Sequence, residues 1–399
     1  MSEGMTGRDS ASGVPPSASG GGPAHEADPA PRPVTVLFGG PSAEHDVSVV
    51  SGWAIADALE AGGFGVERLF IDLFGSWWRL PASAASGRPH PGIFDSPAAV
   101  GADGPWTPAE ALAILAGRAE RPVVFVALHG PFGEDGTVQA LLEAYGLAYT
   151  GAGVAASAVG MDKAIFKRLV EGVGLPVVEW VEVRAADWAR DRARGLAGLE
   201  AFASKIGEAR LIVKPSRLGS SVGMTIAHAA GERAAALDTA FEFDTAAVVE
   251  RYLDHPRELE VAVIGNDLTG LLALGPGEVF PGREFYDYVA KYTDGVSRTT
   301  VEPEVDAAVG ERIREVARAA YVAIGCEGFA RVDFLASGQH VYLSEINTIP
   351  GFTPISLFPQ LAAASLGGFG AVCAYIVELA RERHAGRVRR SLTTSDLPR

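Results

Sequence analysis

The sequence predicts an α/β fold that opens with a parallel sheet, and two observations lead to this prediction. Short apolar runs at residues 34–38, 66–71 and 123–128 have the length of buried strands. A helical pattern over residues 47–61, closed by a pair of glycines, separates the first two runs. Strand, helix and strand in this order form the repeating unit of an open parallel sheet.

The composition argues against several classes of protein. The chain has 399 residues, which is enough for two or three domains. Its net charge is −15 and lysines are few, so nucleic-acid and anionic-membrane partners are not expected. Cys326 and Cys373 fit no zinc or redox motif and indicate a reducing compartment. We predict a soluble, cytoplasmic protein, in which the uncharged stretch at 361–377 is a buried terminal helix.

The remaining pattern alternates helices and strands. Residues 1–33 contain no Leu, Ile, Phe, Trp or Tyr and are predicted to be a disordered tail. A helix over 162–171 ends at glycines with a proline just beyond them. Strands are expected at 211–213, 224–226, 248–253 and 259–264, and a hairpin at 329–335 with 341–346.

The Ser/Gly segment from Lys214 to Gly223 allows two interpretations. The chain has no Gly-Lys dipeptide and no GxGxxG, so a Walker-type phosphate loop and a dinucleotide fingerprint are excluded. Gly219 to Gly223 matches the GxSxG nucleophile elbow with Ser221 as the nucleophile, although a strand and not a helix is expected to follow. The alternative is a loop whose backbone N–H groups wrap phosphate oxygens, with Lys214 supplying charge at its base. An ordinary glycine hairpin without a ligand would show the same residues.

The predicted C-terminal hairpin carries four polar residues at strand spacing. Arg331 and Asp333 share a face of the first strand, and Glu345 and Asn347 share a face of the second. All four lie on one face if the loop has an odd number of residues, such as 337–339, and not if the number is even. Three oxygen ligands beside an arginine suit magnesium that holds a polyphosphate and are poor ligands for zinc. A solvated charged face is the competing interpretation.

Lysines and glutamates elsewhere are weaker signals. Lys163, Lys214 and Lys291 lie in distinctive local sequences, and each is a candidate for contact with a phosphate. Glu250 and Glu258 flank a predicted strand pair, where a ribose and an adenine would fit. Each of these residues alone is also explained by an ordinary surface position.

Seven motifs occur together in a family order. They are GGPSAEHDVS at 39–48, HGPFGEDG at 129–136, MDK at 161–163, KPSRLGSSVG at 214–223, FYDYVAKY at 285–292, RVDF at 331–334 and EINTIPGFT at 345–353. Over residues 34–385 the chain thereby resembles the D-alanine–D-alanine ligases. The resemblance implies the three-domain ATP-grasp fold, in which ATP lies between the central and C-terminal domains.

The implied domains divide the chain into five parts. They are a tail at 1–33, an N-terminal α/β domain at 34–151 that binds the first D-alanine, a central domain at 152–249, a C-terminal domain at 250–387 and a frayed tail at 388–399.

The resemblance also assigns residues to ATP and its metal ions. ATP would be bound by Lys163, Lys214, Ser220, Ser221, Glu250, Leu253, Glu258 and Lys291. Two magnesium ions, which manganese can replace, would be bound by Asp333, Glu345 and Asn347.

A second set of residues would handle the two amino acids. Substrate residues would be Glu44, His129, Ser356 and Leu357, and catalytic residues would be Glu44, Ser220, Tyr292, Arg331, Gly351 and Ser356. In the implied scheme Glu44 holds the first ammonium group, while Arg331 and the N–H of Gly351 stabilise the oxyanion. Tyr292, on a closing loop, links to Ser220 and through it to Glu44.

The implied reaction joins two D-alanines through D-alanyl phosphate, for peptidoglycan precursor synthesis. The resemblance also implies a homodimer, and no nucleic-acid or membrane partner is expected. The AKY sequence at 290–292 favours an amine over a hydroxyl as the nucleophile. The alternatives are another ATP-grasp carboxylate–amine ligase, of the D-Ala–D-Ser or D-Ala–D-Lac type, and more remotely a serine hydrolase.

Overall fold

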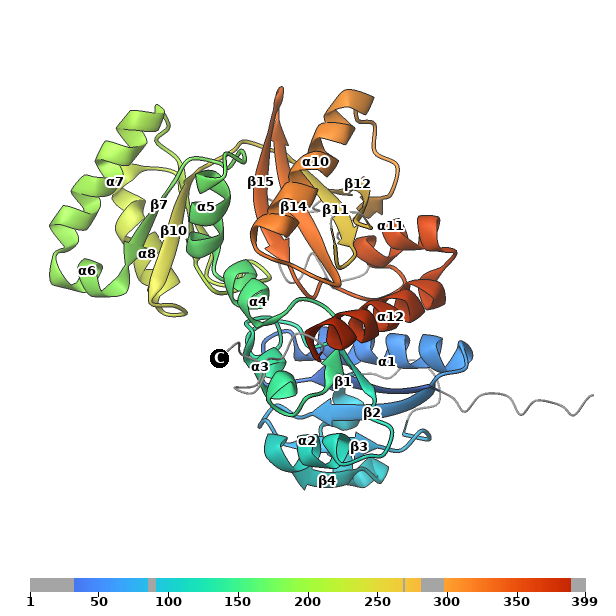
Figure 1. Ribbon diagram of the computed structural model, residues 1–399. Coiled ribbons are helices and arrows are strands. Elements are labelled where there is room, and N and C mark those ends of the chain that lie inside the picture. The colour runs from blue at the N-terminus through green and yellow to red at the C-terminus, as the bar shows by residue number, and fades with distance from the viewer. Residues whose placement is uncertain (1–31, 85–90, 268–269, 281–297, 389–399) are drawn as a thin grey trace, which may run out of the picture. The chain divides into compact units, whose positions relative to one another are not determined.

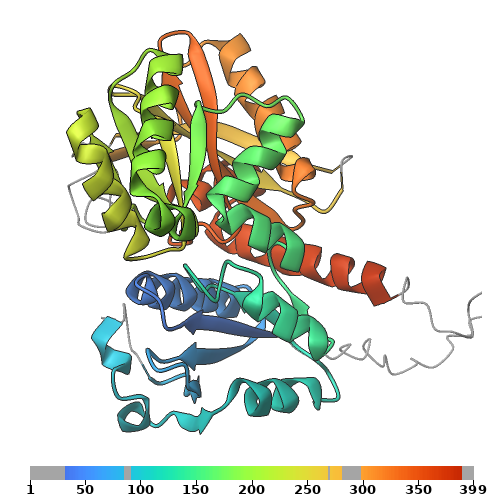
Figure 2. The ribbon, with the colours of Figure 1, turned by 90° about the vertical axis from the view of Figure 1, so that its left-hand side faces the viewer.

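Three β-sheets with their covering helices carry the part of the chain that this computed structural model describes, namely residues 32–84, 91–267, 270–280 and 298–388 (Figures 1 and 2). The sheets follow one another along the sequence and contain six, four and five strands. The predicted α/β class is confirmed. The predicted N-terminal tail lies almost entirely outside the described residues.

The N-terminal sheet has the strand order β4-β3-β2-β1-β5-β6. Its strands are β1 (Pro33–Gly39), β2 (Gly65–Ile71), β3 (Trp77–Leu80), β4 (Asp103–Trp106), β5 (Val123–Val126) and β6 (Ala148–Tyr149). β1, β2, β5 and β6 run parallel, and β3 and β4 extend the sheet antiparallel at one edge. The predicted open parallel sheet is therefore confirmed, with an antiparallel edge that the sequence analysis did not predict.

Helices cover both faces of this sheet. They are α1 (His45–Ala61) and α12 (Phe369–Val388) on one face, and α2 (Pro108–Ala116) and α3 (Thr137–Ala144) on the other. Successive residues of β1 enter the two cores in turn, since Phe38 packs with Trp53 of α1 and Leu37 packs with Leu112 of α2. A strand that is buried on both faces has a continuous apolar sequence.

The central sheet is antiparallel, with the strand order β7-β10-β8-β9. Its strands are β7 (Trp180–Arg184), β8 (Leu211–Pro215), β9 (Thr225–Ala227) and β10 (Ala246–Arg251), and its helices are α6 (Ala185–Arg190), α7 (Arg192–Ile206) and α8 (Arg233–Phe241). Leu211 and Val213 of β8 belong to the core beneath these helices. Because side chains alternate along a strand, Lys214 points to the opposite face.

The C-terminal sheet is also antiparallel, with the strand order β13-β12-β11-β14-β15. Its strands are β11 (Arg257–Ile264), β12 (Leu272–Phe280), β13 (Arg298–Thr300), β14 (Phe329–Ser337) and β15 (His340–Asn347), and its helices are α4 (Val154–Met161), α5 (Lys163–Gly172) and α10 (Ala307–Ala323). Val261 and Val332 share a core with Ile313 of α10. Alternation therefore directs their neighbours Glu260 and Arg331 to the other face.

The hairpin of β14 and β15 places the four predicted polar residues on one face of the sheet. Arg331 pairs directly with Asn347, and Asp333 pairs directly with Glu345. Residues that are directly opposed on neighbouring strands have their side chains on the same side of the sheet. Of the two arrangements left open by the sequence, the structure therefore has the one with all four side chains on a common face.

The common face does not arise from the odd loop on which the sequence analysis made it depend. Ser337 pairs with His340, which leaves a two-residue loop, and an even loop alone would send the two polar pairs to opposite faces. The register then shifts between Asp333 and Phe334, so that Ser344 is an extra residue on β15. This β-bulge restores the common face, and the bulge could not be predicted from the sequence pattern.

The apolar stretch at 361–377 forms parts of two helices, so the single buried helix predicted there is wrong. α11 (Leu357–Leu366) is capped by Gly367, whose φ of 90° is a left-handed conformation that glycine adopts readily. α12 then begins at Phe369, and the two helices meet at 88°. Within the described ranges, no single helix is long and apolar enough to span a membrane, whereas this bent pair satisfies the same length and composition criteria.

The predicted domain boundaries stay a prediction. The boundary after residue 151 falls between β6 and α4, whereas the boundary after residue 249 falls inside β10. The chain from Arg32 onward clusters as one compact unit, so its contacts do not divide it at either position.

Helix α1 lies close to β1 because residue 52 is a glycine. A Cβ atom at Gly52 would lie 2.4 Å from the Cβ of Phe38. We predict that Gly52→Ala lowers the free energy of unfolding by about 1–3 kcal/mol, the usual cost of overpacking, measured by urea denaturation. Gly198→Ala is the control, because a Cβ there meets nothing within 4 Å, and it should be neutral or stabilise by up to about 1 kcal/mol. Equal effects would contradict this account.

Candidate active site

A cavity of about 410 Å³ lies between the polar faces of the central and C-terminal sheets. Strands β8 and β10 contribute to one wall, strands β11, β14 and β15 contribute to the other, and the loop after β8 also lines the space. Ten residues predicted for ATP, metal or catalysis are brought together here: Lys163, Lys214, Ser220, Ser221, Glu250, Leu253, Glu258, Arg331, Asp333 and Glu345.

Glu250 is the centre of a buried charge cluster in the central-sheet wall. One of its carboxylate oxygens lies 2.9 Å from Nζ of Lys214, and the other lies 2.9 Å from Nζ of Lys167 on α5. Burial alone would raise the pKa of Glu250, but the two ammonium groups outweigh burial and lower the pKa to about 2. The carboxylate is therefore ionised and held in place at neutral pH.

The two lysines respond differently to this carboxylate. Burial lowers the pKa of Lys167, and the attraction of Glu250 only partly opposes that effect. Burial acts in the same direction on Lys214, but the attraction of Glu250 and Glu345 exceeds it and raises the pKa. Lys214 thus keeps its positive charge at the cavity wall, where it is suited to a phosphate group.

Arg331 organises the opposite wall. Its guanidinium donates hydrogen bonds of 2.8 and 2.7 Å to the two carboxylate oxygens of Asp333, and it lies 3.3 Å from Glu260. Burial opposes the charge, yet these carboxylates hold the pKa of Arg331 well above its usual value. The wall therefore presents a fixed cation beside carboxylates.

The residues predicted for magnesium lie beside this arginine. Asn347 donates a 2.9 Å hydrogen bond to Asp333, and Nζ of Lys163 lies 3.3 Å from Glu345. Among the residues with described positions, no three His, Cys, Asp or Glu side chains gather as metal ligands. The predicted set consists of two carboxylates and one amide, and such oxygen donors on one sheet face fit magnesium.

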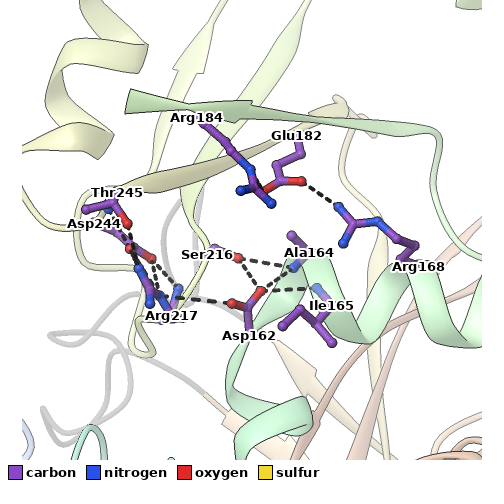
Figure 3. A network of polar contacts seen from close by, with 10 residues as sticks. All are labelled: Asp162, Ala164, Ile165, Arg168, Glu182, Arg184, Ser216, Arg217, Asp244 and Thr245. Carbon is purple, nitrogen blue, oxygen red and sulfur yellow. Dashed lines mark hydrogen bonds and ion pairs between the residues drawn. The ribbon is translucent and has the colours of Figure 1, made fainter. Parts of the chain in front are cut away.

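The loop after β8 is anchored where it begins (Figure 3). Asp162 caps the first turn of α5 by accepting hydrogen bonds from its backbone N–H groups, and it also accepts one from the hydroxyl of Ser216. Arg217 forms an ion pair with Asp244. These contacts tie the start of the loop to α5 and to the turn before β10.

The nucleophile-elbow interpretation of Ser221 is wrong. The loop leads from β8 into β9, whereas an elbow requires a helix after the turn. Ser220 and Ser221 have φ angles of 50° and 57°, in the left-handed region that residues other than glycine rarely adopt. The interpretation that fits is a loop facing the cavity.

Glu44 contacts this loop. The hydroxyl of Ser220 donates a hydrogen bond to the carboxylate of Glu44, so one half of the predicted link is present. Gly130 comes close to Glu44, since a Cβ at residue 130 would lie 2.9 Å from Oε2 of Glu44. Lys291 and Tyr292, which complete the predicted link and lid, lie outside the described residues.

Three further predicted residues follow β15 and do not line the cavity. The hydroxyl of Ser356 accepts a 3.1 Å hydrogen bond from the N–H of Thr353 and would lie 3.4 Å from a Cβ at Gly351. Leu357, the first residue of α11, is buried against Gly277. Their contacts with a substrate stay a prediction.

His129 is buried and both of its ring nitrogens have partners. Nδ1 lies 3.0 Å from the carbonyl oxygen of Ile349, and Nε2 lies 3.1 Å from the hydroxyl of Ser51. Glu134 lies 3.7 Å from Nδ1, and burial raises the pKa of Glu134 even though His129 opposes that shift. The predicted substrate contact of His129 also stays a prediction.

Two charged residues of the site, Lys167 and Glu260, are not among the residues predicted from the sequence. Lys167 follows Lys163 by four residues, so the two lie on one face of a helix. Glu260 alternates with Glu258 on β11, so both belong to the same face of a strand. The spacing was visible in each case, but the partner strand that buries or exposes the face was not.

Two opposed sheets that present lysines, carboxylates and an arginine to one cavity, next to an N-terminal parallel sheet, define the ATP-grasp class of fold and site. Family models narrow this class. The model described as D-ala D-ala ligase N-terminus matches residues 33–152, and the model described as D-ala D-ala ligase C-terminus matches residues 169–378. The chain belongs to the D-alanine–D-alanine ligase family.

Individual relatives cover nearly the whole chain. The D-alanine–D-alanine ligase of Chloroherpeton thalassium is 37% identical over 90% of this chain and 99% of its own length. That of a Bradyrhizobium species is 39% identical over 88% and 96%. Among solved structures, the ligase from Coxiella burnetii has a TM-score of 0.73 at 30% identity, covering 90% of this chain and 97% of its own. The VanG D-Ala:D-Ser ligase from Enterococcus faecalis has a TM-score of 0.70 at 29% identity, covering 88% and 99%.

The ion pairs of Glu250 make stability depend on pH. A carboxyl whose pKa is about 2 in the folded state, against an ordinary 4.5, stabilises the fold above about pH 4.5 and loses that contribution as the pH falls toward 2. We predict that Glu250→Gln lowers the free energy of unfolding by about 3 kcal/mol at pH 7, and that the difference from the wild type shrinks below pH 4.5. Denaturant titrations at several pH values measure both effects.

Glu242→Gln, at an exposed position after α8, is the matched control and should change stability by less than about 0.5 kcal/mol. An equally small effect of Glu250→Gln at pH 7, or an effect that does not change with pH, would contradict the stabilising role given to the Glu250 ion pairs.

Proposed function

We propose that this chain catalyses the ATP-dependent joining of two D-alanine molecules to D-alanyl-D-alanine, with release of ADP and phosphate, for peptidoglycan precursor synthesis. The observation that carries the proposal is the cavity between two charged sheet faces, in a chain of this family. A carboxylate does not condense with an amine at neutral pH, because it has no good leaving group. Transfer of the ATP γ-phosphoryl group to the first D-alanine would supply one as an acyl phosphate.

The proposed ATP site uses the charges of both walls. Lys163 and Lys214 would neutralise phosphate oxygens, with Ser220 and Ser221 on the adjoining loop. The fixed Glu250, together with Leu253 and Glu258, would receive the adenosine. All seven residues line the same cavity, which supports the assignment. The proposed contact of Lys291 with a phosphate is supported only by the family resemblance.

Asp333, Glu345 and Asn347 would hold two magnesium ions, or manganese in their place. Such ions supply charge neutralisation to the transferring phosphoryl group when bound. The contacts of Asp333 with Arg331 and Asn347 keep these side chains together on one face of the sheet. The chain's own contribution is therefore a pre-arranged set of oxygen donors beside a fixed cation.

The proposed amino-acid sites lie where the N-terminal part of the chain meets the loop after β8. Glu44 would bind the ammonium group of the first D-alanine, and its hydrogen bond from Ser220 would orient it. Arg331 and the N–H of Gly351 would meet the charge that develops on the carbonyl oxygen when the second amine attacks. Ser356 and Leu357 would complete the substrate contacts, and His129 would lie near the first D-alanine with both ring nitrogens bound within the protein.

The finer parts of the proposal rest on the resemblance. They are division of labour among three domains with the first D-alanine in the N-terminal one, closure by a loop that carries Tyr292, a homodimeric state and a cytoplasmic location.

The direct test is product identification. The enzyme with MgATP should release phosphate with D-alanine and form D-alanyl-D-alanine, identified by mass, and should not turn over with L-alanine. Formation of D-alanyl-D-lactate or D-alanyl-D-serine from mixed substrates at a comparable rate would reassign the second substrate. If no alanine isomer stimulates phosphate release, the proposed reaction is wrong.

The role of Arg331 predicts a specific kinetic effect. Lysine cannot reproduce the paired hydrogen bonds of a guanidinium, so Arg331→Lys should lower kcat about 100-fold to 1000-fold, while KM for ATP changes little. Arg312→Lys, on the exposed surface of α10, is the matched control and should leave steady-state kinetics unchanged. A kcat within a few-fold of the wild type would remove Arg331 from the proposed oxyanion site.

A further inference from the structure

The backbone around Gly351 is fixed at both ends by apolar packing. Ile349 is 3% exposed and lies in the core on the α2 and α3 face of the N-terminal sheet. Phe352 is 1% exposed, and its ring centroid lies 5.7 Å from those of Phe125 and Phe329. Packing of this kind holds the two ends of the segment in place but does not by itself set the orientation of the peptide groups between them.

A hydrogen-bond chain connects the same two ends through α1. The N–H of Phe352 lies 3.4 Å from the hydroxyl oxygen of Ser51, whose oxygen lies 3.1 Å from Nε2 of His129. Nδ1 of His129 lies 3.0 Å from the carbonyl oxygen of Ile349. The chain therefore begins and ends on the backbone on either side of Gly351.

The partners determine the direction of each hydrogen bond. A carbonyl oxygen only accepts, so Nδ1 of His129 carries a proton and donates it to Ile349. With the proton assigned to Nδ1, Nε2 accepts from the hydroxyl of Ser51, and that hydroxyl oxygen accepts from the N–H of Phe352. Glu134, at 3.7 Å, is a more distant partner for Nδ1 than the carbonyl oxygen. Every donor in the chain has an acceptor.

We propose that Ser51 and His129 are positioning residues that set the orientation of the Gly351 peptide group. The inference rests on the proposed function, in which the N–H of Gly351 meets the oxyanion. Ser51 follows Glu44 by seven residues, about two turns of helix, so α1 would align the first D-alanine and the oxyanion donor with each other. Ser51 is fully buried, which excludes a contact with bulk solvent as the reason for its hydroxyl.

The kinetic test uses variants that break the chain at different points. Ser51→Ala should lower kcat for D-alanyl-D-alanine formation about tenfold, with KM for ATP within twofold of the wild type, because a misoriented oxyanion donor affects the transition state and not the ground state. His129→Ala should lower kcat about 100-fold. His129→Asn should recover at least tenfold of that loss, since its amide N–H can replace the donor to Ile349.

A matched control and a second measurement separate positioning from general loss of structure. Ser157→Ala removes another buried helical hydroxyl, one without a hydrogen-bond partner among the described residues, and should leave kcat unchanged. Hydrogen exchange, followed by mass spectrometry of the segment 349–353, should be about tenfold faster in Ser51→Ala and unchanged in Ser157→Ala, at equal urea midpoints.

Two results would overturn the inference: unchanged exchange of this segment in Ser51→Ala, or equal kcat values for His129→Asn and His129→Ala. If the wild type forms no D-alanyl-D-alanine, the proposed function fails, whereas the exchange measurement still decides whether Ser51 holds this backbone.

Discussion

Side-chain alternation along the strands is the constraint on which the site depends. Each strand of the central and C-terminal sheets buries one face under helices, so its other residues must point away from that core. Val213 and Lys214 divide in this way on β8, and so do Val332 and Arg331 on β14. Because the two polar faces meet at one cavity, the packing that stabilises each sheet also determines which charges line that cavity. The bulge at Ser344 is also required for this arrangement. Without it, Glu345 and Asn347 would lie on the opposite face of the sheet from Asp333.

The charged side chains that alternation directs to the cavity are also paired with one another. Carboxylates and cations taken from water are tolerable only when they are paired. Glu250 satisfies two lysines at once, and Arg331 lies between Asp333 and Glu260. Fixed charges of this kind need no reorganisation when a phosphoryl group is transferred, which is how an enzyme of this class gains most of its rate. The apolar anchoring of the segment around Gly351 extends the same principle to the backbone.

Local sequence patterns predicted much of this arrangement. They did not predict the features that depend on contacts between residues far apart in the sequence. The common face of Arg331 and Glu345 stayed open in the sequence, because it depends on the register of the hairpin. The parallel N-terminal sheet and the helix over residues 162–171 followed from periodicity and turn residues. The bulge at Ser344 did not, because an extra residue on one strand leaves no mark on that strand's own pattern. The stretch 361–377 was predicted to be one buried helix because it is apolar and too short to span a membrane, although it contains Gly367, Gly368 and Gly370. Lys167 and Ser51 were missed because their importance depends on Glu250 and His129, which are distant in sequence. The identity of the substrate was inferred from the family motifs, because no pattern of charge or hydrophobicity identifies a substrate.

In the proposed reaction, the γ-phosphoryl group of ATP is transferred to a substrate carboxylate at the charged cavity. The most direct test is turnover with D-alanine that carries ¹⁸O in its carboxyl group, followed by mass analysis of the released phosphate. Transfer through an acyl phosphate predicts that one labelled oxygen passes to the inorganic phosphate for each D-alanyl-D-alanine formed. Unlabelled phosphate, or label recovered in AMP, would contradict the claim, because the carboxylate would then not have been the acceptor of the γ-phosphoryl group.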